Sequence, residues 1–326
     1  MGKVALVDID LNRWNPELFV KGSVLEPYAI ECLGAFLKKE NIDVVLLQFD
    51  KGPAWEIAQT ILSHSPDIVG FSVLSKSYNI SRMVAQEIKR QRPDILIIFG
   101  GYHPSGMPEI VENKEIDIVV IGEGEATLLD IVKAFEQKNR YEAISGIAYW
   151  KDGLRINPPR SRIKEMDSLP WPIRVREWLE KSKVAQPIYP PQAGQRNVAQ
   201  INYSRGCIYS CAFCCSPKLW QKKVFWRSAK EVVKEANYLK NNYEINLLYF
   251  TDLSFNINLK KVYELCQEFI EQKVEIGWTA DCRFLPGIPF DFFKIMAKAG
   301  CTRIAWGLES VSDITLSKIQ KNKVWI

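Results

Sequence analysis

Residues 202–214 have the sequence NYSRGCIYSCAFC, and no other stretch of the chain is as informative. Its three cysteines, Cys207, Cys211 and Cys214, are separated by three residues and then by two, and Phe213 precedes the third. A compact loop can aim three thiols with this spacing at one point. Thiolates are the usual ligands of iron–sulfur clusters, and three of them leave one iron of a four-iron cluster open for chemistry. The stretch therefore predicts a cluster with an open metal position.

Structural zinc and disulfides are the main alternatives for these cysteines. A zinc site wants a fourth ligand, but Cys215 directly adjoins Cys214, and the two histidines of the chain, His64 and His103, lie far upstream. Eight cysteines in 326 residues are sparse for a disulfide-stapled secreted scaffold, and the start, MGKVALVD, predicts a buried strand and not a targeting segment. The pattern favours a cluster over both.

The stretch resembles the signature of the radical S-adenosylmethionine (radical SAM) superfamily, which has the same spacing and an aromatic residue before the last cysteine. This resemblance implies a 4Fe-4S cluster held by Cys207, Cys211 and Cys214, with SAM chelating the open iron. It further implies reductive cleavage of SAM to a 5′-deoxyadenosyl radical, with the electron coming from an external donor such as flavodoxin or ferredoxin. Phe213 is then expected to pack beside the adenine.

Composition places the chain among ordinary globular proteins. Apolar residues make up 47% and charged residues 25%, which is enough for a packed core. The net charge of +5 comes from dispersed Lys and Arg, so no nucleic-acid surface is indicated. No apolar run approaches the roughly 18 residues of a membrane span. Free thiols and a labile cluster favour a reducing cytoplasm, and the length favours two domains.

The first part of the chain, residues 1–140, alternates short apolar runs with amphipathic stretches. The pattern predicts strands at residues 4–9, 44–49, 68–74, 95–99 and 118–121, with helices at residues 28–39, 56–63, 80–91, 108–113 and 126–137. Continuous apolar strands between helices indicate a parallel sheet covered on both faces. We therefore expect an α/β, doubly wound, Rossmann-like (flavodoxin-like) domain, with its ligand beyond the carboxyl ends of the strands.

Small residues gather where those strands end. Glycines and serines there would let a large, flat ligand approach the backbone closely, and no Gly-x-Gly-x-x-Gly follows the first strand to suggest a dinucleotide. The candidate binding residues are Ser72, Ser75, Gly100, Gly101, His103, Gly122, Glu123 and Gly124. A plain alternative is an inert flavodoxin-like platform, in which Glu123 favours the positive end of the next helix and the serines only close turns.

This part also resembles the cobalamin-binding domain of cobalamin-dependent radical SAM proteins. The resemblance lies in the order and spacing of EPY at residues 26–28, PDIVGFS at 66–72, GGYHP at 100–104 and GEGE at 122–125. It implies cobalamin at the strand ends named in the preceding paragraph. Proteins whose histidine binds cobalt carry Asp-x-His-x-x-Gly after the first strand, whereas His103 follows the fourth and matches only part of that motif. We therefore expect His103 to be a loop residue near a cobalamin that has no histidine ligand.

Residues 141–195 are predicted to form a connector. A β-hairpin is expected at residues 145–157, turning at Asp152-Gly153. Dense prolines then mark an irregular segment, in which Trp171 and Trp178 are expected to be packing anchors.

Residues 196–326 predict four further β/α units, part of a parallel barrel. Strands are expected at residues 198–203, 247–250, 275–279 and 303–306, with helices at residues 229–241, 259–272 and 290–299. Function in such barrels lies at the carboxyl ends of the strands. By resemblance to the radical SAM core, SAM contacts are expected from Asp252, Arg283, Glu309 and Ser310. Four of the other cysteines, Cys215, Cys266, Cys282 and Cys301, are most simply buried small hydrophobes.

The resemblance implies six β/α units, and the chain supplies four. A fragment, a truncated gene and a barrel closed by a partner are all open. The expected function is that of a cobalamin-dependent radical SAM enzyme acting on a small molecule, with methyl transfer to a weakly activated carbon as the favoured reaction. The alternatives are a radical SAM enzyme without cobalamin, and a non-catalytic cluster-binding protein.

Overall fold

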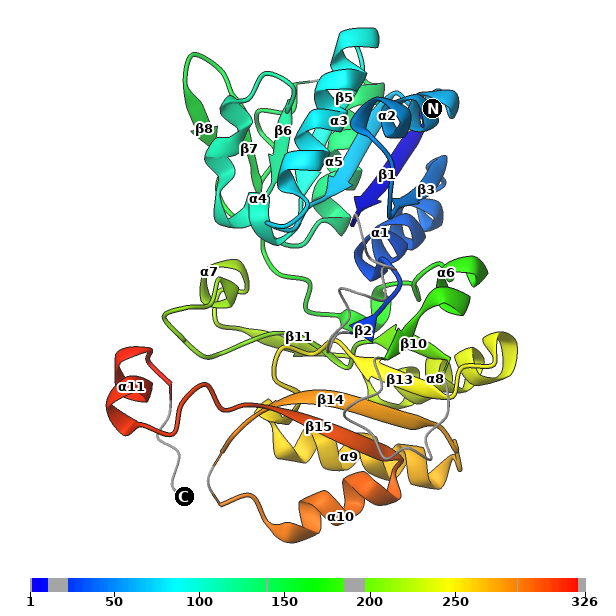
Figure 1. Cartoon of the computed structure of the whole chain (residues 1–326), viewed down its shortest axis with the longest axis vertical. Coiled ribbons are helices and arrows are strands. Elements are labelled where there is room, and N and C mark those ends of the chain that lie inside the picture. Colours follow the sequence, from blue (N-terminus) through cyan, green and yellow to red (C-terminus); the bar gives the residue numbers. More distant parts are fainter. Residues whose placement is uncertain (1, 11–22, 139, 185–196, 286, 322–326) are drawn as a thin grey trace. The chain divides into compact units, whose positions relative to one another are not determined.

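The structure is a computed structural model that describes residues 2–10, 23–138, 140–184, 197–285 and 287–321. The chain forms two compact units (Figure 1). The first unit contains residues 2–10, Pro27–Ile163 and Pro170–Ile173. The second contains residues 23–26, Lys164–Leu169 and the described chain from Arg174 onward. Each unit is described by itself below.

A seven-stranded sheet of order β3-β1-β4-β5-β6-β7-β8 forms the centre of the first unit. Its first five strands in the chain are parallel and have the flavodoxin-like order, which confirms the doubly wound prediction. Four of them are largely buried and apolar, as strands covered on both faces must be, whereas β3 at the edge of the sheet is mostly half-buried. The strands are β1 (Val4–Ile9), β3 (Val44–Phe49), β4 (Ile68–Ser72), β5 (Leu96–Gly100), β6 (Ile118–Val120), β7 (Ile147–Trp150) and β8 (Leu154–Ile156).

Helices cover both faces of this sheet. Two of them, α2 (Ala54–Ser63) and α3 (Tyr78–Gln91), share one apolar cluster with the strands, while α1 (Tyr28–Lys39) contacts α5 (Glu125–Glu136). The helix predicted at residues 108–113 is instead the 3-10 helix η2 (Pro108–Glu112). The short helix α4 (Tyr102–Gly106) was not predicted, and it contains His103, which we expected in a loop.

The predicted hairpin is present and turns at Asp152 and Gly153, whose φ angles of 51° and 119° suit a tight turn. Its first strand, β7, pairs antiparallel with β6. The hairpin therefore extends the sheet of the first unit, although we had placed it in the connector.

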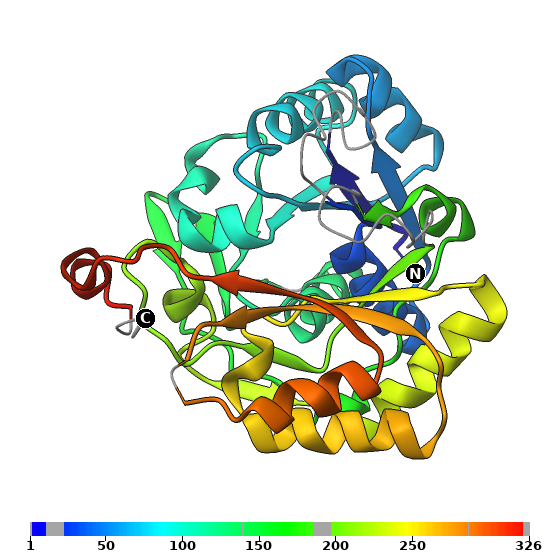
Figure 2. The same ribbon diagram turned by 60° about the horizontal axis from the view of Figure 1, so that its bottom comes forward.

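The second unit is built on a parallel sheet of order β10-β13-β14-β15 (Figure 2). Its helices α8, α9 and α10 all join one apolar cluster around Trp278 and therefore cover the same face. Ser228 and Asn258 cap α8 and α9 by accepting from the backbone of Glu231 and Lys261. The elements are β10 (Val198–Ile201), α8 (Ala229–Tyr243), β13 (Leu247–Phe250), α9 (Leu259–Glu271), β14 (Gly277–Arg283), α10 (Phe290–Lys298) and β15 (Cys301–Gly307).

Several short elements complete the second unit. An antiparallel pair, β11 (Ser204–Gly206) and β12 (Val224–Trp226), brackets the cysteine stretch and was not predicted. The others are β2 (Ser23–Val24), η3 (Met166–Ser168), α6 (Arg176–Lys181), β9 (Lys183–Val184), α7 (Ser216–Leu219), η6 (Phe255–Ile257) and α11 (Asp313–Lys318). Of the connector, Trp178 is buried as expected, and residues 185–196 lie outside the described part.

No helix within the described ranges has the length and apolar character needed to cross a membrane.

Candidate functional site

The three cysteines of the signature lie in one loop, between β11 and α7. Cys207 and Cys211 are half-buried and Cys214 is exposed. Burial raises the pKa of Cys207, and the nearby thiols of Cys211 and Cys214 raise it further. In the described part of the chain no three metal-ligating side chains are already drawn together around one point. What the three thiols share is therefore one loop between β11 and α7.

The loop is tied to its surroundings by backbone hydrogen bonds. Cys214 N donates to Cys211 O over 3.1 Å, and Ala212 N donates to Ile319 O over 2.9 Å. Ser216 N, at the start of α7, donates to Cys214 Sγ over 3.4 Å. One thiol therefore already accepts a hydrogen bond from the backbone.

Asp252, two residues after β13, holds the chain just before the cysteines. Its Oδ2 accepts from Tyr203 N over 2.9 Å, and its Oδ1 accepts from Ser204 N and from Ser204 Oγ, each over 2.6 Å. Burial raises the pKa of Asp252 to about 6, although these three donors oppose the shift. Both carboxylate oxygens are thus engaged with the polypeptide, and a contact of Asp252 with SAM stays a prediction.

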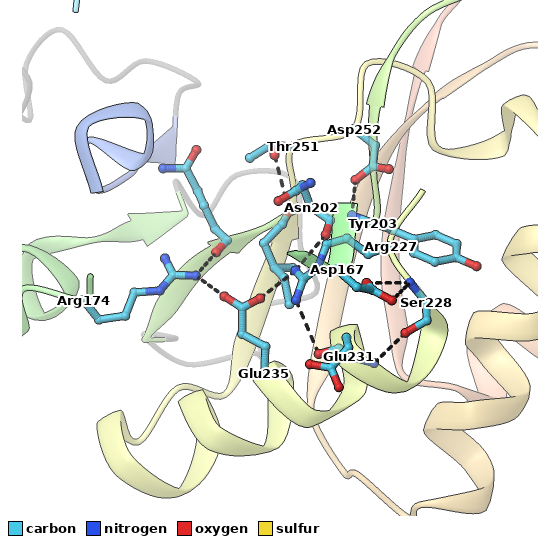
Figure 3. A network of polar contacts seen from close by, with 12 residues as sticks. Asp167, Arg174, Asn202, Tyr203, Arg227, Ser228, Glu231, Glu235, Thr251 and Asp252 are labelled. Atoms are coloured by element: carbon cyan, nitrogen blue, oxygen red, sulfur yellow. Dashed lines mark hydrogen bonds and ion pairs between the residues drawn. The ribbon is translucent and has the colours of Figure 1, made fainter. Parts of the chain in front are cut away.

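A buried network of charges holds the same segment from another side (Figure 3). Glu235 lies between two guanidinium groups, at 2.9 Å from Arg174 Nη2 and 2.6 Å from Arg227 Nη1, and all three side chains are 8% exposed or less. Arg227 Nη1 also donates to Asn202 O over 3.1 Å. The network is therefore anchored on α8 and reaches the residue that follows β10.

Glu26 is the second carboxylate of this network, and it pairs with Arg174. Its Oε1 accepts from Arg174 Nη1 over 2.9 Å and from Gln200 N over 2.6 Å, and Ser182 Oγ donates to its Oε2 over 3.3 Å. We had placed Glu26 among the residues that resemble a cobalamin-binding domain. The structure places it in the second unit, as the carboxylate that neutralises Arg174.

Arg283 is the last residue of β14, a strand that runs four residues further than the predicted end at residue 279. The sequence had placed Arg283 beyond the strand, but it pairs in register with Gly307 of β15. Its Nη1 donates to Cys211 Sγ over 3.1 Å, and its Cζ lies 3.9 Å from the centre of the Tyr209 ring. The predicted arginine therefore meets the cysteine loop.

Three other predicted SAM-contacting residues lie near the end of β15 and on the loop. Glu309 Oε1 is 2.8 Å from Lys321 Nζ, and the same ammonium lies 5.8 Å from the centre of the Phe213 ring. Phe213 is 58% exposed, so its ring has a face open to a ligand. Ser310 Oγ accepts from Ser312 N over 3.1 Å. Lys321 was missed by sequence analysis and links Glu309 to the loop.

Of the four cysteines expected to be buried, two are buried. Cys266 and Cys282 are buried and Cys301 is half-buried in the apolar cluster of the second unit. Cys215 is exposed, which corrects the expectation that it is a buried hydrophobe. It follows Cys214 directly and turns into α7, so the core is out of its reach.

In the first unit, the ends of β4 and β5 pack backbone against backbone. Val73 N donates to Gly100 O over 2.8 Å, and His103 N donates to Val73 O over 3.2 Å. Gly101 has a φ of 102°, and a Cβ there would lie 2.9 Å from Val73 O. Only glycine fits this position. Ser72 is the last residue of β4, at the same edge.

His103 faces Ser75 and Tyr78. Its Nδ1 is 3.1 Å from Ser75 Oγ, and its ring centre is 4.5 Å from that of Tyr78. Burial lowers the pKa of His103, which makes it neutral at pH 7. Its Nε2 is buried and has no hydrogen-bond partner among the described residues. The ring therefore leaves one polar atom for a ligand.

The segment after β6 combines an open glycine with a buried ion pair. Gly122 has a φ of 91°, and a Cβ there would meet nothing within 4 Å. Glu123 Oε2 is 2.6 Å from Arg162 Nε, with both side chains nearly buried, and accepts from Ile163 N over 3.0 Å. Glu123 is thus a structural anchor and not only a charge near a helix end. Gly124 caps α5, and a Cβ there would lie 3.0 Å from Leu33 Cδ2.

Sequence analysis also missed an ion pair at the point where the strand order reverses. Asp10 follows β1 and Lys76 follows β4, and Lys76 Nζ is 2.7 Å from Asp10 Oδ2. These two strands are neighbours in the sheet. Ligands of open α/β sheets bind at such a switch point.

The residues present fit the groups that the sequence implies. Three thiols in one loop, with a guanidinium donating to one of them, are the donor set of a cluster with an open iron. At the edge of the first unit, the space at Gly122 and the unpaired Nε2 of His103 are consistent with a large ligand containing polar groups. The sets of residues are distinct, and each lies at a carboxyl edge of parallel strands.

Comparison with known proteins agrees with this division. Residues 19–132 match the B12 binding domain, and residues 201–325 match the Radical SAM superfamily. An uncharacterized methyltransferase of Pyrococcus horikoshii is 29% identical over 93% of this chain and 64% of its own length. The anaerobic magnesium-protoporphyrin IX monomethyl ester cyclase of Rubrivivax gelatinosus is 29% identical over 82% of this chain and 48% of its own.

Solved structures show the same fold. The radical SAM methyltransferase TsrM of Kitasatospora setae, solved with cobalamin and a [4Fe-4S] cluster, superposes with a TM-score of 0.79 and 19% identity, covering 100% of this chain and 63% of TsrM. The chain thus spans about two thirds or less of the length of these relatives. The chain thus carries a match to the B12 binding domain ahead of a match to the Radical SAM superfamily.

Proposed function

We propose that this chain supplies the cofactor-binding part of a cobalamin-dependent radical SAM enzyme. One observation carries the proposal: three thiols share a loop whose start is fixed by buried Asp252 and whose Cys211 accepts from buried Arg283. A loop restrained in this way at the edge of a parallel sheet suits an open-iron cluster. The B12-binding match over residues 19–132 supports cobalamin as the second cofactor.

Each residue set has a physical task in this proposal. Cys207, Cys211 and Cys214 hold the cluster, while Arg283, Glu309 and Ser310 provide the charged and polar groups for SAM, with Phe213 against its adenine. When bound, the cluster supplies one electron to cleave SAM, and cobalamin supplies the methyl group. The chain itself positions the cofactors and keeps water away from them.

For the cobalamin, the first unit offers room. Gly100, Gly101, Gly122 and Gly124 keep side chains off the strand edge, and Ser72, Ser75 and His103 place polar atoms along it. Since Nδ1 of His103 is next to Ser75 and its ring stacks near Tyr78, we propose that the imidazole contacts the ligand without binding the cobalt.

Methyl transfer to a weakly activated carbon of a small molecule is the favoured reaction. The Pyrococcus relative and TsrM are both named methyltransferases, and one TsrM structure contains tryptophan as substrate. The Rubrivivax relative is named a cyclase, so ring formation is the second candidate. A flavodoxin- or ferredoxin-like donor would supply the electron. Free thiols near a cluster suit a reducing compartment such as the cytoplasm.

The test is anaerobic reconstitution with iron, sulfide and hydroxocobalamin, followed by reduction with SAM and chromatography for 5′-deoxyadenosine. We expect deoxyadenosine from the wild type and none from Cys211→Ala, with Cys215→Ala as the matched control that keeps the activity. Cobalamin that co-elutes with the protein would support the second cofactor. A bound cluster that never cleaves SAM would contradict the proposal that these residues form the SAM site.

A further inference from the structure

Arg283 is a buried cation without a carboxylate partner in the described part of the chain. The residue is 6% exposed, and its one hydrogen bond through a side-chain nitrogen is the 3.1 Å contact from Nη1 to Cys211 Sγ. Its Nε is buried and makes no hydrogen bond to any described residue. A buried guanidinium normally needs an anion, because leaving it unpaired costs several kcal/mol or more.

A buried side-chain amide holds the backbone of Arg283. Asn256, which is 1% exposed, accepts from Arg283 N through Oδ1 over 2.9 Å and donates to Arg283 O through Nδ2 over 2.8 Å. One side-chain amide thus forms hydrogen bonds with both the backbone N–H and the backbone C=O of Arg283, the last residue of β14. The Tyr209 ring then packs against the guanidinium, with Cζ 3.9 Å from the ring centre.

Three other cations of the second unit each have a carboxylate partner. Lys321 Nζ lies 5.8 Å from the centre of the Phe213 ring, but its charge is already balanced by Glu309 at 2.8 Å. Arg227 pairs with Glu235, and Arg174 pairs with both Glu235 and Glu26. Arg283 alone among these four leaves its positive charge for the cysteine loop.

We propose that Arg283 tunes the reduction potential of the cluster, by donating a charge-assisted hydrogen bond to the Cys211 thiolate. Hydrogen bonds to the ligating sulfurs and nearby charge are among the features that set the potential of an iron–sulfur cluster. Reduction adds one negative charge, so a fixed cation beside a ligand stabilises the reduced form. Arg283 therefore raises the potential and makes the one-electron reduction by the external donor easier. The inference rests on the proposed cluster at the three cysteines.

The test is a redox titration of the reconstituted protein, with dithionite as reductant and the paramagnetic reduced cluster as the signal. We expect Arg283→Gln to lower the midpoint potential by at least about 59 mV, a tenfold change in the one-electron equilibrium. Arg283→Lys keeps the charge but loses the planar fork, and it should fall between wild type and Arg283→Gln. Lys321→Gln is the matched control and should change the potential far less.

The outcomes separate the two proposals. If the wild type binds no iron and sulfide, the proposed function fails. If clusters form in all variants with equal potentials, only the tuning role is overturned. The titration is run with and without SAM. A shift that appears only with SAM would mean that Arg283 acts through SAM alone, as in the proposed function, and it would overturn the tuning through Cys211. A cluster content equal to that of the wild type shows that each variant has folded.

Discussion

The two strand edges that carry the candidate sites are built in opposite ways. The edge of the first unit is made by leaving side chains out, since Gly101 packs on the backbone of Val73 and Gly122 opens onto free space. At the edge of the second unit, charged side chains are held in place by hydrogen bonds. Asp252 accepts from Ser204, and Arg283 donates to Cys211. A large, flat ligand requires room, whereas a cluster requires a restrained loop with a defined charge around it. Added atoms should therefore damage the first site, and removed charges the second.

The largest effect is expected from Glu235→Gln. This change keeps the size of the side chain but leaves Arg174 and Arg227 without their shared carboxylate, in a place where all three are nearly buried. Breaking a buried ion pair costs about 3–5 kcal/mol, a large part of the stability of a domain. The free energy of unfolding in urea measures this loss.

Glu177→Gln is the matched control for that experiment. Glu177 pairs with Lys181 on the surface of α6, with side chains 71% and 45% exposed, and such a pair contributes about 0–1 kcal/mol. Equal losses for the two variants would refute the view that the buried network restrains the second unit.

Asp252→Asn should lower the free energy of unfolding by about 1–3 kcal/mol, because an amide cannot accept all three hydrogen bonds that the carboxylate accepts. The effect should depend on pH. The folded pKa of about 6 lies above the usual value, so the folded state binds the proton more tightly than the unfolded state. The stability that Asp252 contributes is then complete below pH about 4 and falls as the pH rises through about 6.

Thermal unfolding of wild type and Asp252→Asn between pH 4 and pH 7 isolates the pH-dependent contribution of Asp252 to stability, since the other groups titrate alike in both proteins. The stability difference should narrow as the pH rises. A difference that stays constant over the range would show that the carboxyl does not titrate in this window.

Gly122→Leu tests the first edge. The leucine fills the space beside the glycine, and we expect cobalamin retention to fall about tenfold, or ~1.4 kcal/mol of binding free energy. Gly153→Leu is the control, because Gly153 also has a positive φ and open space but lies in the tip of the hairpin. Cobalamin co-elution and absorbance give the readout. If both variants retain cobalamin equally, the edge near Gly122 is not the binding site.

The smallest effect is expected from His103→Ala. Since its Nδ1 is directed to Ser75, removing the ring should cost less than about 1.5 kcal/mol of cobalamin binding, the size of one hydrogen bond. The electron paramagnetic resonance spectrum of the Co(II) form should show no nitrogen splitting from imidazole in either protein. Splitting that disappears in the variant would show that His103 does bind the cobalt.

Much of the fold could be predicted because its signals are local. The strands and helices of both units follow hydrophobic periodicity, and β1, β3, β13 and α1 have the predicted bounds. The short helix α4 escaped prediction because five residues are too few for a helical period. The pairing of β11 with β12 joins segments about 20 residues apart and leaves no repeating pattern between them.

The cysteines could be identified for the same reason, since their spacing is a local motif. Their supports could not, because each depends on two residues that meet only in the folded chain. Arg174 donates to Glu26 across 148 positions and to Glu235 across 61, and Asp252 accepts from Ser204 across 48. Such contacts are specified by packing and have no period or spacing in the sequence.

The carboxylate of Glu235, which two arginines share, also restricts which substitutions this sequence can accept during evolution. Any lone replacement of Arg174, Arg227 or Glu235 leaves an uncompensated charge in the interior. Replacing these three by apolar residues together with Glu26, which also pairs with Arg174, removes all of the buried charges. Among homologues these positions should therefore change in concert or not at all. Covariation between positions 174, 227 and 235 would then mark proteins that share this interior, independently of the reaction they catalyse.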